Sequence, residues 1–375
     1  MADIVEIFLQ RLGCSDDGDG HGTRRVVFFT YCELAATLFF AVLTYLSLVY
    51  WSTGDHLSIR IYGLLCFVIE IYIFAYTAVR VYHQSEHRDM YQRSRKVGIP
   101  ENYRRKIETV IKYHLVMSNV VLAIPMLCTI SLDGLRMGDP FTFPFMDVLP
   151  IKTTNVTVYV CKYILYTFPL YFAHLELCFL NVTFMYSTGA VIRHFQILDE
   201  QVEEAMVTED EQKLKIAIIH HQQVLKFFKD MKTVYEKPLL LTIEGFGLYI
   251  GLCCCAIIQV IQGFVDQIIL GLCIASCVAG FMTISLYCIC ASNMYDLQNG
   301  ILNSLFDHRS CYSRKQSFKR LILIMMTRAT IPLEFNVYSL FIVNLNLLVK
   351  ILKLTYSVLN VLLTTINLKF KETAT

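Results

Sequence analysis

Seven long apolar stretches alternate with polar segments along this chain. A bilayer core of ~30 Å is crossed by about 20 apolar residues in a helix. Four of the stretches carry no Asp, Glu, Lys or Arg, two carry a single Glu, and the last carries two Lys. Their ranges are 34–54, 61–79, 113–132, 163–192, 245–265, 267–295 and 335–368. The pattern predicts an all-α membrane protein with seven transmembrane helices.

The basic residues between these stretches gather in every second loop. They follow the second, fourth and sixth stretches, and the clearest examples are Arg88, Arg93, Arg95, Lys96, Lys213, Lys215, Lys226, Lys229, Arg314, Lys315, Lys319 and Arg320. Cytoplasmic loops of membrane proteins are enriched in Lys and Arg. We therefore expect the N-terminus in the cytoplasm and the C-terminus outside. This orientation is opposite to that of an ordinary seven-helix G-protein-coupled receptor and excludes that class.

Two glycosylation sequons bear on the orientation. Asn155-Val156-Thr157 lies between the third and fourth stretches, on the predicted outer side, where a glycan can be attached. Asn181-Val182-Thr183 lies inside the fourth stretch, and we expect it to stay bare. Asn155 is therefore the predicted glycosylation site.

Composition excludes several other classes. The chain has 375 residues, is 55% apolar and carries a formal net charge of +2, so nucleic acid is not an expected partner. Most of the 14 cysteines lie within the apolar stretches and match neither a zinc site nor a secreted disulfide framework. No nucleophile motif, phosphate-binding glycine loop or carboxylate pair is visible, so no enzymatic activity, cofactor or metal is expected. Residues 1–32 are expected to form a cytoplasmic segment without a cleavable signal peptide.

Several polar regions on the cytoplasmic side also read as helices. Thr208 and Glu211 form a capping-box pattern, after which apolar residues recur at helical spacing to an end near Pro238. This segment is expected to prolong the fifth span into the cytoplasm, with one apolar face packed on its neighbours. The sixth span should continue as a helix to Leu305. A short amphipathic helix around Phe318, Leu321, Ile322, Met325 and Met326 should be stopped by Pro332. These apolar faces predict a packed intracellular bundle, with contacts between subunits.

The tail of the chain carries the most specific pattern. Residues 326–333 read Met-Thr-Arg-Ala-Thr-Ile-Pro-Leu, and residues 344–357 read Asn-Leu-Asn-Leu-Leu-Val-Lys-Ile-Leu-Lys-Leu-Thr-Tyr-Ser. This resembles the last span of insect odorant receptors, where a leucine pattern precedes Ile-Leu-Lys, one further residue and Ser/Thr-Tyr-Ser. Leu348 stands where that family usually has Phe, a conservative change. Length, number of spans and orientation resemble the family along the whole chain.

The same resemblance separates three kinds of insect chemoreceptor. Gustatory receptors typically have a Gln-Phe pair a few residues after Thr-Tyr, where this chain has Leu362 and Leu363. The shared odorant receptor co-receptor has a much longer loop between spans four and five. The sequence thus resembles a ligand-tuning odorant receptor. A gustatory-type chemoreceptor, which would form homomeric channels, and a secondary transporter, which should show inverted repeats, are the alternatives.

The resemblance implies a ligand-binding subunit of an odorant-gated, non-selective cation channel in the plasma membrane of an olfactory neuron dendrite. Such a subunit assembles with the co-receptor as a heterotetramer. Its other partners are a small volatile odorant that it binds, the membrane lipid around it and the cations that permeate the channel. The implied segments are the N-terminal 1–32, an odorant-binding bundle at 33–190, helices five and six with a cytoplasmic anchor at 191–335, and a pore-lining half-helix with a short extracellular tail at 336–375.

The family's gate lies near the end of the chain, where the matching positions are Thr364, Asn367 and Leu368. A ring of leucines can dewet a narrow pore, and its withdrawal exposes polar groups such as Asn367 to hydrated ions. The alternative for Leu368 is ordinary contact with lipid.

The resemblance also implies an odorant pocket in the outer half of the bundle. The matching side chains are Tyr62, Phe67 and Tyr72 on the second span, Ile124, Leu127 and Ile130 on the third, and Phe168, Tyr171 and Phe172 on the fourth. Aromatic rings form rigid apolar walls, and a tyrosine hydroxyl can orient one polar atom of a ligand. So many aromatics favour a small planar aromatic odorant. An interfacial aromatic belt is the alternative, and it is preferred for Tyr163.

Charged residues inside the spans are functional candidates because they are costly there. Glu70, His174 and Glu176 are expected either to pair across helices or to face a water-filled vestibule. Lys350 and Lys353 on the last span are expected to make structural pairs where the anchor meets the pore.

Overall fold

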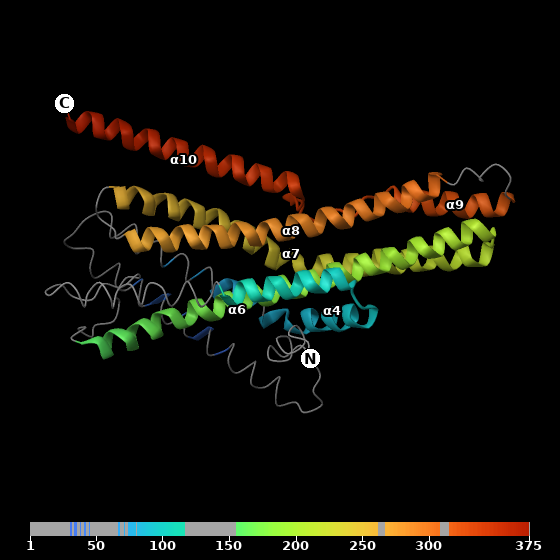
Figure 1. Cartoon of the computed structure of the whole chain (residues 1–375), viewed down its shortest axis with the longest axis horizontal. Helices are drawn as coiled ribbons and strands as arrows, with labels where there is room; N and C mark the ends of the chain where they lie inside the picture. The colour runs from blue at the N-terminus through green and yellow to red at the C-terminus, as the bar shows by residue number, and fades with distance from the viewer. Residues whose placement is uncertain are drawn as a thin grey trace.

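The computed structural model describes residues 74–79, 81–116, 155–261, 267–307 and 315–374, with a few single helical positions between Tyr31 and Ile71. Within these ranges the structure does not describe the side chains of 166–176 and 251–261, most of those at 267–276 and 358–374, and a few others. Three long helices dominate (Figure 1): α6 (Val156–Thr208), α7 (Glu211–Ile261) and α8 (Gln267–Asp307). The described part of the chain is predominantly helical, in agreement with the predicted all-α class.

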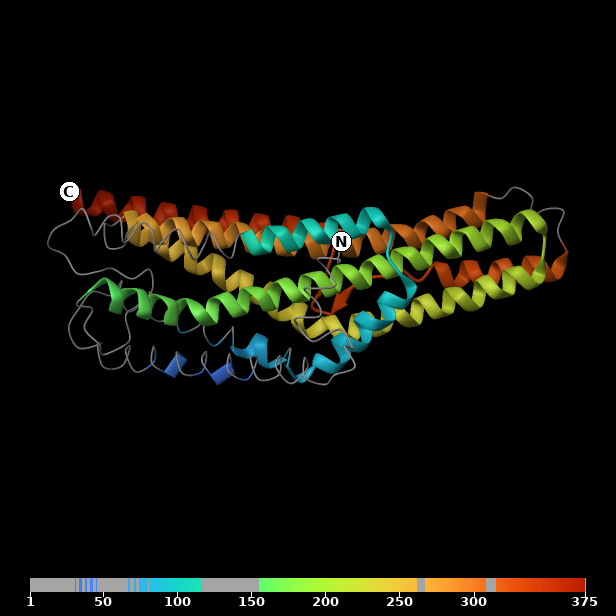
Figure 2. The same cartoon turned by 60° about the horizontal axis from the view of Figure 1, so that its bottom comes forward.

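Shorter elements pack onto this three-helix frame. Helix α4 (Gln84–Val97) contacts α6 and α7, while α9 (Gln316–Ala329) contacts α7 and α8. Helix α10 (Leu345–Ala374) also contacts α7 and α8 near its start, and Figure 1 shows it leaving the bundle at an angle towards the C-terminus. Residues 101–116 are helical as well. Figure 2 shows how the long helices run side by side along the molecule.

The length of α6 decides how far the bundle extends. At 1.5 Å per residue its 53 residues span about 80 Å, more than twice the ~30 Å hydrocarbon core of a bilayer. Helix α6 therefore contains the whole fourth predicted span and continues well beyond it. The part of α7 that precedes Gly245 packs beside this continuation. Helix α9 packs against α7 and α8 at the same end of the bundle.

The helix predicted around residues 208–238 does not start at Thr208 or end near Pro238, but the prediction that it continues into the fifth span is confirmed. Thr208 is the last residue of α6, and the α7 start is capped by Asp210, whose carboxylate accepts hydrogen bonds from the backbone of Gln212 (2.7 Å) and Lys213 (3.4 Å). Helix α7 also continues through Pro238. A proline inside a helix costs about 3 kcal/mol, but the flanking Tyr235 and Leu239 are fully buried, and that packing holds the helix together.

The last apolar stretch, predicted as one helix from 335 to 368, is divided. Strands β1 (Asn336–Val337) and β2 (Phe341–Ile342) pair antiparallel before α10 begins. Tyr338 and Ser339 turn the hairpin with φ of 46° and 58°, a left-handed conformation that non-glycine residues adopt at some cost. The segment assigned to the pore-lining half-helix, 336–375, therefore begins with a hairpin.

The other helices predicted outside the spans agree with the structure in their extent. Helix α8 runs past Leu305, and α9 buries Phe318, Ile322 and Met325 and ends before Pro332. Among the described residues, one stretch, Cys277–Phe306, is long and apolar enough to cross a membrane. The number of spans and the side of each terminus stay predictions.

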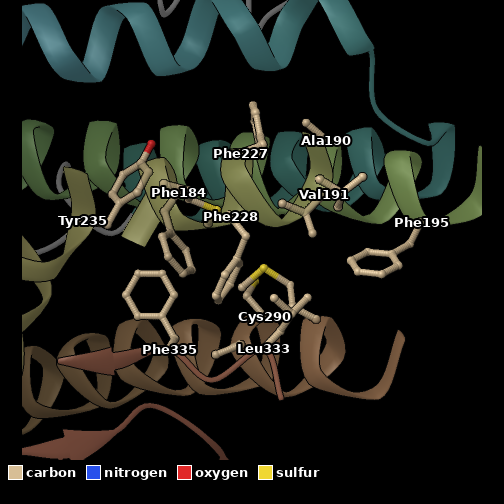
Figure 3. Packing of buried hydrophobic residues seen from close by; sticks show 14 of the residues in the cluster. Phe184, Ala190, Val191, Phe195, Phe227, Phe228, Tyr235, Cys290, Leu333 and Phe335 are labelled. Atoms are coloured by element: carbon tan, nitrogen blue, oxygen red, sulfur yellow. The ribbon is translucent and has the colours of Figure 1, made fainter. Parts of the chain in front are cut away.

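The core is centred on an aromatic cluster that joins α6, α7, α8 and the chain before the hairpin (Figure 3). Phe184 of α6 makes edge contacts with the rings of Tyr235, Tyr287 and Phe335, at centroid distances of 5.2, 5.1 and 5.6 Å. Edge-to-face pairs of this kind add about 0.5–1.5 kcal/mol beyond the area they bury. Because Phe335 directly precedes β1, the cluster also fixes where the last segment of the chain leaves the bundle.

Candidate functional site

The predicted pocket residues are only partly within the described structure. Phe168, Tyr171 and Phe172 lie on α6 as helical residues, but their side chains are not described. Phe67 is half-buried in a helical segment, and its ring lies against Tyr45, 5.8 Å between centroids. The remaining candidates, Tyr62, Tyr72, Ile124, Leu127 and Ile130, lie outside the described residues, as do Glu70 and the side chains of His174 and Glu176. The pocket stays a prediction.

The predicted gate residues all lie on α10. Thr364 is exposed, and its hydroxyl donates to the backbone carbonyl of Asn360 at 2.8 Å. Asn367 and Leu368 lie one turn further along the helix, with side chains outside the description.

Helix α10 has three distinct faces. Leu347, Leu348 and Ile351 pack against the bundle. On the side away from the bundle, polar side chains recur every three or four residues and are all exposed: Asn346, Lys350, Lys353, Ser357, Asn360 and Thr364. Exposed apolar residues flank this polar stripe, with Leu345, Val349, Leu352 and Tyr356 on one side and Leu354 and Val361 on the other. A helix in this arrangement can present the stripe to water and the flanks to lipid or neighbouring helices.

Lys350 and Lys353 do not make the predicted structural pairs within the described residues. Both lie exposed in the polar stripe, in the first turns of α10, and no ion pair joins either to a described acidic residue.

Specific hydrogen bonds attach the start of α10 to the bundle. Asn344 caps the helix by accepting from the Leu347 backbone at 3.0 Å, and the Ser292 hydroxyl of α8 accepts from the Leu345 backbone at 3.2 Å. The Glu236 carboxylate of α7 accepts from the Tyr338 backbone at 2.5 Å, in the hairpin turn. An Asn before an apolar run is a known cap signal, so Asn344 could have been found from sequence, whereas Ser292 and Glu236 could not.

A buried side chain of α8 binds the C-terminal end of α9. The Gln298 amide of α8 donates to the backbone carbonyls of Ala329, at 3.1 Å, and of Ile331. The last carbonyls of a helix lack partners within the helix, so Gln298 satisfies the end of α9 and positions the chain that leads to Pro332.

Buried hydrogen bonds join α6, α8 and the helical residues 101–116. The Tyr287 hydroxyl of α8 donates to Oδ1 of Asn181 on α6, and Nδ2 of Asn181 lies 2.9 Å from Nε2 of His114 in the helical residues 101–116. Asn181 and Thr183 are fully buried, which agrees with the expectation that this sequon stays bare. Asn155 is exposed and caps α6 through Oδ1, which accepts from the Val158 backbone at 2.9 Å, so its Nδ2 stays available for a glycan.

Histidines lie where α6 and α7 pack beyond the fourth predicted span. Nδ1 of His194 lies 3.0 Å from Nε2 of His220, whose Nδ1 contacts Gln201 at 2.9 Å. Burial lowers the pKa of both histidines, and the neighbouring charge of His220 lowers the pKa of His194 further. On the other side of α7, Arg93 of α4 pairs with Asp230 at 2.8 Å. Within the described residues, no group of three or more His, Cys, Asp or Glu could hold a metal.

Comparisons with known proteins agree with this architecture. The chain resembles two structures of the insect olfactory receptor OR5 from Machilis hrabei, one of them in complex with eugenol. Their TM-scores are 0.73 for the eugenol complex and 0.76 for the other, and each shares 14% sequence identity and covers 96% of this chain and 97% of the receptor. At this identity the likeness shows the fold. No curated protein matches in sequence.

The comparison with family models shows the family as well as the fold. The family model described as "7tm Odorant receptor" matches residues 84–356, from the first residue of α4 to the first three turns of α10. The match includes α4, α6, α7, α8, α9, the hairpin and nearly all of the motif at the start of α10. The chain therefore belongs to the 7tm odorant receptor family.

Proposed function

We propose that this protein is the odorant-binding subunit of a heteromeric, odorant-gated, non-selective cation channel, formed with the odorant receptor co-receptor in the plasma membrane. The observation that carries the proposal is the family match over residues 84–356. The similarity of fold to an olfactory receptor over nearly the whole chain supports it. In this arrangement the N-terminus is cytoplasmic and the C-terminus extracellular.

The faces of α10 support a pore-lining role for this helix. Its polar stripe points away from its own bundle, which is where a central pore between subunits would lie. The exposed apolar flanks, such as Val349 and Leu354, would then meet neighbouring subunits or lipid. The pore-lining segment of this proposal starts at Leu345, after the hairpin, with the gate at Thr364, Asn367 and Leu368. Lys350 and Lys353 lie in the first turns of α10, and their pairing with acidic groups of a neighbouring subunit stays a prediction.

The remaining segments follow the division expected from sequence. Residues 33–190 would hold the odorant, and residues 191–335 would form the cytoplasmic anchor. The solved relative binds eugenol, a small aromatic molecule. The aromatic candidates Phe168, Tyr171 and Phe172 suit a ligand of the same kind. A planar aromatic volatile is therefore the proposed ligand class.

The test is current recording in cells that express the protein alone and together with the co-receptor. We expect odorant-evoked cation currents only in the co-expressing cells. Currents from the protein alone would favour a gustatory-type homomeric channel, and substrate uptake without channel currents would favour a transporter.

A second measurement tests the orientation separately. An epitope placed at the N-terminus should be labelled by antibody only after permeabilisation, whereas one placed after Thr375 should be labelled in intact cells. Surface labelling of the N-terminal epitope would contradict the proposed arrangement of the whole chain.

A further inference from the structure

A serine hydroxyl at the far end of the bundle joins the starts of two helices. Ser317, the second residue of α9, is exposed, and its Oγ donates a hydrogen bond to Oε1 of Glu211, the first residue of α7. Figures 1 and 2 both place this end of α9 at the end of the bundle where α6 turns into α7. The bond thus connects α9 to the tip of the α6–α7 pair.

The start of α9 is rich in positive charge and poor in capping groups. Lys315, Lys319 and Arg320 surround Ser317, the first turn contains no acidic residue, and Lys315 at the N-cap position makes no side-chain cap. The N-terminus of a helix carries a partial charge of roughly +0.5, so it favours an anion and disfavours bases. The carboxylate of Glu211, which reaches across from α7, supplies that anion.

We propose that Ser317 is a phosphorylation site for a basophilic serine/threonine kinase, and that the phosphoryl group breaks the contact between the start of α9 and the start of α7. Such a kinase recognises basic side chains around the acceptor by an acidic substrate groove, and Lys315 and Arg320 lie two residues before and three after Ser317. The proposal rests on the proposed function, because that orientation puts α9 in the cytoplasm with ATP and kinases.

The transfer uses one nucleoside triphosphate. Oγ of Ser317 forms a new bond to the γ-phosphorus of ATP, the bond from that phosphorus to the β–γ bridging oxygen breaks, and ADP leaves. The hydroxyl proton of Ser317 passes to a carboxylate of the kinase. Phe318 is buried, so the first turn of α9 must open for the kinase to bind. A helix end without a side-chain cap opens more readily than a capped one.

The modification would replace one anion at the α9 start by another. A phosphoserine carries a charge of about −1.5 to −2 and suits a helix N-terminus surrounded by bases. The same charge repels Glu211 and removes the hydroxyl proton that Ser317 now donates to it. The start of α9 therefore keeps a stabilising anion, while the hydrogen bond from Ser317 to Glu211 of α7 is lost. Gln298 binds the backbone at the other end of α9. A movement of this helix can therefore displace the segment that leads to α10.

The first experiment treats the full-length protein in detergent with a purified basophilic kinase and ATP, followed by peptide mass spectrometry. Thr327 is a matched control, since it is exposed on the same helix but its hydroxyl is bound within the helix to the Leu323 carbonyl. We expect at least tenfold more phosphate on Ser317 than on Thr327, and none at position 317 in Ser317→Ala. Labelling of Ser317 no higher than that of Thr327 would overturn the proposal.

The second experiment measures hydrogen exchange in the phosphorylated protein. The first turn of α7, at 211–215, should exchange several-fold faster, whereas the first turn of α9 should not. In Glu211→Gln, phosphorylation should leave α7 unchanged, because the repulsion is gone. Equal exchange of α7 with and without phosphate in the unaltered protein would reject the loss of this contact. Both experiments work in detergent, so a channel that fails to conduct, or an inverted orientation, would count against the proposed function alone.

Discussion

His221 is a buried base on α7, next to the His194–His220 pair and close to Arg328 of α9. Within the described residues its Nε2 has no hydrogen-bond partner. Burial, then the charges of His220 and Arg328, lower the pKa of His221 from its usual 6.5 to about 4. The folded state therefore holds His221 neutral under conditions in which the unfolded chain would protonate it.

The sign of the resulting pH dependence is fixed. Between pH 6.5 and 4 the unfolded state binds more protons at this site than the folded state, so stability falls as the pH is lowered through that range. The loss from His221 should reach at most about 3 kcal/mol. We expect thermal unfolding of the receptor in detergent to shift less between pH 7 and pH 4.5 in His221→Phe than in the unaltered protein. An identical pH slope in the two proteins would contradict this assignment.

Asn155 has two separable roles at one position. Asn155→Gln should remove both the glycan and the α6 cap, and loss of a cap costs about 0.5–2 kcal/mol. Thr157→Ala should remove the glycan alone, because Asn155 still accepts from the Val158 backbone. Both variants should run as the deglycosylated form on a gel, and only the first should lower thermal stability. A glycan that survives Thr157→Ala would place modification elsewhere and remove this support for the orientation.

At the scale of elements, α9 shows how one short helix can serve two partners. Phe318, Ile322 and Met325 face the core of their own chain, whereas Leu323 and Ile324 are exposed. Leu321, which the sequence also predicts to pack within the bundle, lies against its core, as do Leu225 and Phe228 of α7. Packing between subunits stays a prediction, and the exposed face of α9 is the place to test it.

Two substitutions on α9 separate folding from assembly. Met325→Asp places a carboxylate in a fully buried site, which should cost at least about 3 kcal/mol and lower the yield of the subunit itself. Leu323→Asp changes a residue that is 64% exposed, so the stability of the isolated subunit should change by about 0.5 kcal/mol or less. Co-purification with the co-receptor should nevertheless fall for Leu323→Asp. Normal co-purification of this variant would show that its face of α9 is not an interface.

At the scale of the whole molecule, ligand binding and ion conduction are proposed to use separate parts of the chain. The odorant would touch Phe168, Tyr171 and Phe172 on α6, and ions would pass the end of α10. The Phe184 cluster and the bonds that hold the hairpin and α10 to α7 and α8 connect the helix that carries the one site to the helix that carries the other. Two sites connected in this way communicate through a shared conformational equilibrium.

The separation can be tested with one variant at each end. Phe172→Ala removes ligand contact worth ~1–3 kcal/mol, so the half-maximal odorant concentration should rise roughly ten- to a hundredfold with an unchanged reversal potential. Leu368→Ser should weaken dewetting at the gate and raise the basal current, without changing the ranking of odorants. Dose series and reversal potentials of both variants provide the measurement. A shifted reversal potential in Phe172→Ala, or a reordered odorant ranking in Leu368→Ser, would refute the separation.

Several elements could be read from the sequence because their signals are local. The apolar spacing around Phe318 and Met325 predicts α9, and the apolar spacing up to Leu305 predicts the long α8. The motif at 344–357 indicates the family that the comparison then shows. In each case a few neighbouring residues carry the information, through helical periodicity or through a short pattern. The class of fold, the helices α8 and α9 and the family were therefore decided by the sequence itself.

Only the tertiary structure decided the features that depend on distant neighbours. Pro238 lies within a helix because Tyr235 and Leu239 are buried between other helices, and a local rule counts the cost of proline without that packing. Residues 336–342 form a hairpin because Glu236 and the Phe184 cluster hold it, although its apolar sequence also suits a span. Ser317 and Glu211 meet although 106 positions separate them. Such contacts follow from how helices pack in three dimensions, and no periodicity in the chain records them.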